Sequence, residues 1–174
     1  MNFHWIYELP FGRSKRLGSS NALRHIAGGW SLGSVATFQT GAPNTVTTQT
    51  NNCNCFSAGA QRPEVLSNPN LPSEKRALTA WFNTAAFAQP SAYTFGNAGI
   101  GVVRGPGLMN IDVSVLRHFR VTERLRAELR GEFFNALNHT NFGNPGATFG
   151  SSTFGVIGSA GPARQIEVGA RILF

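Results

Sequence analysis

The sequence predicts an all-β protein built from antiparallel strands that each have one apolar and one polar face. The clearest strand is residues 164–174, where apolar side chains occupy every second position: Ile166, Val168, Ala170, Ile172 and Phe174. Successive side chains of a strand point to opposite faces, so this alternation gives a strand with a single apolar side. Four further segments alternate in the same way and are predicted as strands: residues 3–9, 30–40, 110–119 and 125–135.

The composition is a second observation in favour of strands. Charged residues make up only 13% of the chain, and 20 glycines and 14 phenylalanines accompany many Asn, Thr and Ser residues. Typical soluble domains carry roughly 25% charged residues, and disordered chains have few aromatic residues and a high charge density. The chain therefore fits strands and long polar loops better than a charged helical domain or a disordered segment.

Residues 125–135 permit two interpretations. Leu125, Leu129 and Phe133 recur every fourth residue, as on one face of a helix. They also fall on one side of a strand whose other side carries alternating Arg and Glu. Gly131 in the middle disfavours a helix, and the neighbouring periodic segments are strands, so we predict a strand here.

The connections between the strands alternate between shorter and longer. Residues 44–109 form the longest connection, rich in Asn, Thr and Pro, and a structureless segment of this length indicates a functional loop. Three short elements are predicted within the connections: helical turns at 21–27, a helix at 77–87 anchored by Trp81, Phe82 and Phe87, and a short strand at 154–157.

This rhythm of connections is typical of outer-membrane β-barrels, which pair short periplasmic turns with long extracellular loops. With Phe174 on the periplasmic side, antiparallel counting places residues 44–109 and 136–163 outside the cell. No stretch approaches the about 20 apolar residues of a membrane-spanning helix. Residues 1–10 lack the basic and apolar regions of a signal peptide, so we expect either the tail of a longer exported protein or a soluble cytoplasmic domain.

Several motifs along the chain point to one family. The most specific spans residues 130–145, from Arg-Gly-Glu-Phe-Phe-Asn to Gly-Asn-Pro; the others are residues 29–32 (Gly-Trp-Ser-Leu), 40–43 (Thr-Gly-Ala-Pro), 81–87, 104–107 (Arg-Gly-Pro-Gly) and the terminal Phe174. Together they resemble the C-terminal end of TonB-dependent outer-membrane transporters of the Oar-like type, over essentially all of residues 1–174. The resemblance implies the last five or so strands of a barrel of about 22 strands, filled by an N-terminal plug domain.

The resemblance also implies a function and partners. The family takes up a ligand, unidentified here, across the outer membrane of a Gram-negative type bacterium with energy from the TonB complex. The implied partners are outer-membrane lipid, the remainder of the barrel with its plug, the TonB complex and the barrel-assembly machinery. That machinery would recognise the apolar positions of the last strand: Ile166, Val168, Ala170, Ile172 and Phe174. The chain shows no plug or TonB-contacting segment, so we do not expect it to transport alone.

Cys53 and Cys55 are the two cysteines of the chain. A metal site normally needs two more ligands at a suitable spacing, and the four histidines are scattered. A loop disulfide in an oxidising compartment is favoured over a metal clip, although a pair separated by one residue is geometrically tight.

No nucleophile, base and orienting group can be assembled from the sequence, so we expect no enzymatic activity and no cofactor or metal. Glu128 and Glu132 share one face of their strand, but they alternate with Arg126 and Arg130. This pattern favours ionised carboxylates in a lumen-facing ladder over a general acid. The formal charge of +7 raises nucleic acid as a partner. The positive residues are spread along the chain, however, so no nucleic-acid binding is expected.

Two alternatives stay open at this point: a soluble, basic all-β binding domain, and a truncated reading frame without independent function. The aromatic residues fit either a soluble or a membrane protein. Trp5, Tyr7, Trp30 and Phe119 would form part of the core of a soluble sandwich, or aromatic girdles at the membrane interfaces of a barrel.

Overall fold

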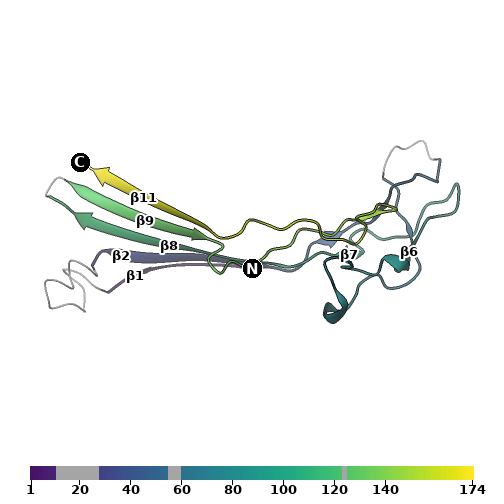
Figure 1. Ribbon diagram of the computed structural model, residues 1–174, viewed down its shortest axis with the longest axis horizontal. Coiled ribbons are helices and arrows are strands. Elements are labelled where there is room, and N and C mark those ends of the chain that lie inside the picture. Colours follow the sequence, from purple (N-terminus) through teal and green to yellow (C-terminus); the bar gives the residue numbers. More distant parts are fainter. Residues whose placement is uncertain (11–27, 55–59, 123–124) are drawn as a thin grey trace. The chain divides into compact units, whose positions relative to one another are not determined.

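The computed structural model describes residues 1–10, 28–54, 60–122 and 125–174. The chain is almost entirely strand and loop, as predicted, and it divides into two compact units (Figure 1). The sheet unit comprises Met1–Gln39, Met109–Thr140 and Pro162–Phe174, and the loop unit comprises Thr40–Leu108 and Asn141–Gly161.

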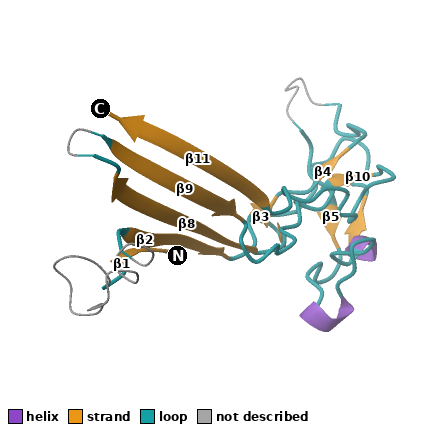
Figure 2. Cartoon of the chain, turned by 60° about the vertical axis from the view of Figure 1, so that its left-hand side comes forward, coloured by secondary structure: helices purple, strands orange, loops and turns teal. Residues whose placement is uncertain are grey.

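The sheet unit is one antiparallel sheet of five long strands (Figure 2). In spatial order they are β1 (Asn2–Glu8), β2 (Trp30–Gln39), β8 (Leu108–Arg120), β9 (Arg126–Phe134) and β11 (Gln165–Leu173). Each long strand lies beside the next long strand along the chain, so the sheet is a meander. All five predicted strands are confirmed, including the strand interpretation of residues 125–135.

The register of the strands keeps the apolar positions together. Phe133 of β9 faces Val113 of β8 on one side and Ile166 of β11 on the other. Gly131 lies two positions earlier, between Val115 and Val168. Because the side-chain period of a strand is two, this register places the predicted apolar sides of all three strands on one face.

Gly29 fixes the start of β2 beside β8. Its carbonyl accepts a hydrogen bond of 3.0 Å from the backbone N–H of His118. Its φ is +80°, and an added Cβ would lie 2.2 Å from the His118 carbonyl oxygen. Only glycine combines that backbone conformation with so close an approach, and this explains why a glycine precedes Trp30 in the motif of residues 29–32.

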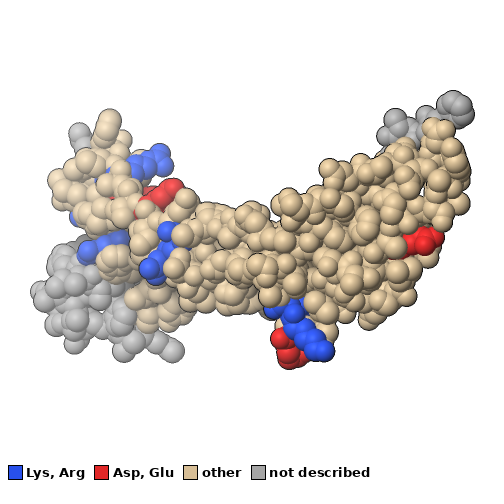
Figure 3. All heavy atoms as spheres, turned by 45° about the vertical axis from the view of Figure 1, so that its right-hand side comes forward, with Lys and Arg blue, Asp and Glu red and all other residues tan. Residues whose placement is uncertain are grey.

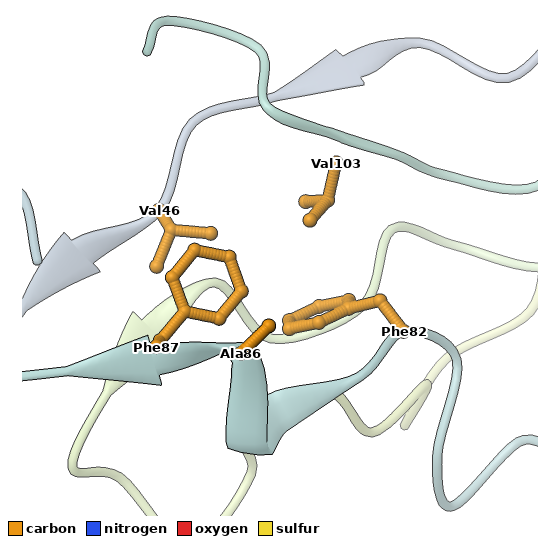
Figure 4. Packing of buried hydrophobic residues seen from close by; sticks show 5 residues of the cluster. All are labelled: Val46, Phe82, Ala86, Phe87 and Val103. Carbon is orange, nitrogen blue, oxygen red and sulfur yellow. The ribbon is translucent and has the colours of Figure 1, made fainter. Parts of the chain in front are cut away.

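The loop unit corrects the prediction that residues 44–109 are structureless. It contains six two-residue strands and two short 3₁₀ turns: β3 (Pro43–Asn44), β4 (Thr47–Thr48), β5 (Glu64–Val65), β6 (Phe87–Ala88), β7 (Val103–Arg104), β10 (Thr148–Phe149), η1 (Ser73–Lys75) and η2 (Thr84–Ala86). A small hydrophobic core holds them together (Figure 4), and its buried members are Val46, Phe82, Ala86, Phe87 and Val103.

The two connections share this core. Phe154, from the second connection, makes edge-to-face contacts with Phe82 and Phe87 of the first, at ring-centroid distances of 5.1 and 5.6 Å. Phe149 makes the same edge-to-face contact with Phe154, at a ring-centroid distance of 5.5 Å. Aromatic side chains bury large areas and favour this geometry, so four rings form the centre of a core that neither connection completes by itself.

Two predicted short elements are wrong. Residues 77–87 form no α-helix, because the backbone N–H groups of Trp81 and Asn83 bond to the distant carbonyls of Gly155 and Pro69. Residues 154–157 form no regular strand, because some of their N–H groups donate to different segments and the others donate within local turns. The short strand of this region is β10. The helical turns predicted at 21–27 lie outside the described residues.

Within the described ranges, no helix has the length and apolar character needed to cross a membrane.

Candidate functional site: the two faces of the sheet

One face of the sheet is apolar and exposed. Val168 is 83% exposed, Ile172 63% and Ile166 57%. Phe3, Trp5 and Tyr7 of β1 are each about half exposed on the same face. A soluble monomer rarely exposes a continuous apolar surface of this kind, so the surface requires an apolar environment outside the sheet.

Aromatic side chains lie at both ends of this apolar face. Tyr7, Trp30 and Phe119 lie at the end where β8 turns into β9, and Phe3 and Phe38 lie at the other end, with their rings 6.5 Å apart in an edge-to-face contact. The eight residue steps from Trp30 to Phe38 span about 26 Å along the strand. With a tilt of about 40°, the span along the membrane normal is about 20 Å, close to the about 25 Å apolar band of outer-membrane barrels.

Arg117 is the one charged residue on the apolar face of the described strands. Its guanidinium lies over the rings of Trp30 and Phe119, at 5.2 and 5.4 Å from the ring centroids. It is therefore at the level of the aromatic residues, where a long basic side chain can reach the polar boundary of a membrane.

The opposite face is polar. Arg130 Nη2 forms an ion pair with Glu132 Oε1 at 2.5 Å, and Glu128 Oε2 lies 3.6 Å from His118 Nδ1. The predicted ladder of alternating Arg and Glu is thus present on β9, but the partner of Glu128 is a histidine of the neighbouring strand. The short connection after β8 could have indicated this pair, because it brings His118 opposite Glu128.

Asn135 closes the other end of β9. It is 5% exposed and has a positive φ of 49°. Its backbone N–H donates to Asp112 Oδ1 at 2.9 Å, its Nδ2 donates to the carbonyls of His139 and Pro162, and its Oδ1 accepts from the His139 N–H. The motif of residues 130–145 therefore contains the residue that ties the ends of β8, β9 and β11 together. Sequence reasoning placed a turn here but missed the link to Asp112.

The predicted assembly positions all lie on β11 or directly after it. Ile166, Val168, Ala170 and Ile172 share the apolar face, and the Phe174 side chain is fully exposed. β11 pairs with β9 along one edge, and its second edge has no partner strand in the described part of the chain. The structure brings these positions together on one edge strand without testing the assembly role.

The loop unit holds the cysteine region. Cys53 is 6% exposed, is engaged in a disulfide, and donates its N–H to Asn51 Oδ1. Cys55 lies outside the described residues, so the pairing of Cys53 with Cys55 stays a prediction. No cluster of His, Cys, Asp and Glu suitable for a metal occurs among the residues that the structure describes. The exposed Glu74 carboxyl has a lowered pKa. The first cause is a hydrogen bond from its own backbone N–H, and the second is a hydrogen bond from the Ser73 hydroxyl, so this pKa shift reflects only the local turn.

An antiparallel sheet with one lipid-compatible face, one polar face and connections of alternating length is part of a membrane-spanning β-barrel. The comparison with protein families agrees: residues 1–167 match the outer membrane beta barrel domain, and the chain belongs to that family. No curated protein and no solved structure matches the chain. The family places the chain in the outer membrane of Gram-negative bacteria, so the alternative of a soluble cytoplasmic domain is wrong.

Proposed function

We propose that the chain is the C-terminal part of the barrel of a TonB-dependent transporter of the Oar-like type, which takes up a ligand with energy from the TonB complex. The observation that carries this proposal is the motif of residues 130–145, which the resemblance singles out and which centres on Asn135. A buried asparagine with positive φ and bonds to three segments is a demanding arrangement. A shared motif at such a position supports a shared barrel framework.

Other resemblance motifs also lie where the geometry is restrictive. A Cβ on Gly41 would lie 1.8 Å from the Gly105 carbonyl oxygen, and a Cβ on Gly105 would lie 2.2 Å from Asn144 Oδ1. Trp81 Nε1 donates to the Arg104 carbonyl at 2.8 Å. These contacts join four motifs within the loop unit, so the resemblance extends from the strands to the architecture of the extracellular loops.

In this proposal the apolar face contacts outer-membrane lipid, and the polar face lines the lumen. The free edges of β1 and β11 pair with further strands, because unpaired backbone groups are costly in lipid. Residues 166, 168, 170, 172 and 174 are the positions that the barrel-assembly machinery recognises. The plug and the TonB complex are the further partners; the chain has no enzymatic role and binds no nucleic acid.

Two measurements in detergent, on the purified whole transporter in which this barrel part is joined to the plug, test the proposal. The periplasmic domain of TonB is titrated onto the protein, and binding is followed calorimetrically; a TonB-dependent transporter binds it, whereas a porin does not. The protein is then inserted into planar bilayers. A plugged barrel gives no stable open channel, so a steady large conductance together with no TonB binding would replace the transporter by a porin-like function.

A further inference from the structure

A cavity lies at the end of the sheet where β8 turns into β9. Its volume is about 320 Å³, and side chains of three neighbouring strands line it, among them His118, Arg120, Arg126, Glu128 and Leu173. These five side chains belong to the polar face, as the register of β8, β9 and β11 requires. In a barrel this face looks into the lumen.

Two arginines that line this cavity are cross-strand neighbours. Arg120 of β8 is directly opposite Arg126 of β9, and both side chains are exposed. Directly opposed side chains in an antiparallel pair have Cβ atoms about 5 Å apart, and like charges there repel each other. Neither arginine makes an ion pair within the described residues. An anion between the two guanidinium groups would turn this repulsion into attraction.

The surroundings add to the positive potential. Arg171 of β11 lies opposite Glu128, which is the one carboxylate among the described residues that line the cavity and which already contacts His118. Figure 3 shows basic and acidic side chains close together on the sheet unit, whereas most of the visible loop-unit surface carries no charged side chain.

Acidic side chains lie at the opposite end of the same face. Glu132 is directly opposite Glu167, and Asp112 accepts a hydrogen bond from the Asn135 N–H. Glu132 is ion-paired with Arg130, so part of this negative charge is neutralised within the face. By contrast, Arg120 and Arg126 are opposed to each other and make no ion pair within the described residues.

We propose that Arg120 and Arg126 form a binding site for one phosphate or carboxylate group of a small ligand in the barrel lumen. The planar guanidinium presents paired N–H donors that match both groups. Both side chains are exposed on the polar face of the described strands, so their N–H donors are available to a ligand. The inference rests on this face being the lumen face, which follows from the barrel family, and it does not depend on coupling to TonB.

The test uses the purified complete barrel protein in detergent at low ionic strength, with inorganic phosphate and succinate as separate probes in calorimetric titrations. We expect one or both anions to bind, and Arg120→Gln and Arg126→Gln each to weaken binding about tenfold or more, which corresponds to about 1.4 kcal/mol. Arg126→Lys keeps the charge but loses the paired donors, so it should give an intermediate affinity. Which probe binds more tightly identifies phosphate or carboxylate as the preferred group.

Two matched variants serve as controls. Arg130→Gln removes an arginine of the same face that is paired with Glu132, and Arg117→Gln removes one of the opposite face at the same end. Both should leave anion affinity unchanged, and circular dichroism verifies that each variant keeps its strands. Absence of binding for both anions at millimolar concentration, or equal losses in the control variants, would overturn the site. TonB binding is measured separately, so failure of one proposal leaves the other standing.

Discussion

The two faces of β11 differ so sharply that one substitution on each should have opposite outcomes. Val168 lies in the middle of the strand and is 83% exposed on the apolar face, at least three residues, or about 10 Å, from either strand end. Val168→Arg therefore places a charge in the apolar band, and its direct partner on β9 is Gly131, which has no side chain to pair with the charge. Arginine near the bilayer midplane costs about 2–4 kcal/mol in outer-membrane barrels.

The adjacent residue supplies the control. Glu167 is on the polar face, directly opposite Glu132, so Glu167→Arg exchanges a like-charge pair for an opposite one and should be neutral or stabilising by roughly 0.2–1 kcal/mol. The assay is reversible unfolding of the complete barrel by guanidinium in phospholipid vesicles, followed by tryptophan fluorescence. Equal losses for both variants, or a cost below about 1 kcal/mol for Val168→Arg, would refute the assignment of the faces.

Three further predictions concern packing and backbone geometry. Phe82→Ala removes a 2%-exposed ring from the loop-unit core and should destabilise that unit by about 3–5 kcal/mol, seen as faster protease cleavage, whereas Phe95→Ala at a 72%-exposed position should not. Asn135→Ala removes the side chain that satisfies two carbonyls and an N–H, and it leaves alanine at positive φ; unfolding should become easier by more than about 2 kcal/mol. Gly29→Ala meets the His118 carbonyl and should lower the yield of folded protein on heat-modifiability gels, while Gly158→Ala, with open space around it, should not.

The strands could be predicted from the sequence because residues that face the membrane alternate with residues that face the lumen, so apolar and polar side chains alternate along each strand. β9 illustrates the point: its helix-like spacing of Leu125, Leu129 and Phe133 competes with its strand alternation, and the pairing of β9 with β8 and β11 on both sides decides for the strand. Local periodicity was sufficient to predict a strand wherever a whole face of that strand is uniformly apolar or polar.

The loop unit was beyond such reasoning, since its elements are two residues long and its core joins distant segments. Nothing in the pattern around Phe82 indicates that its neighbours would be Phe87 and Phe154. The backbone bond from Trp81 to Gly155 likewise crosses between connections. The Arg120 and Arg126 pair follows from the same short turn as the His118 and Glu128 pair, once the register is known, and neither pair was predicted.

The shared core of the loop unit has a consequence for how such proteins diversify. β4 of one connection pairs with β10 of the other, and the four phenylalanine rings interlock between them. Neither connection can therefore be exchanged alone without breaking the core of its partner. A change of specificity in this region must be inherited as a matched pair of segments, and a chimera that exchanges both together is the smallest graft expected to fold.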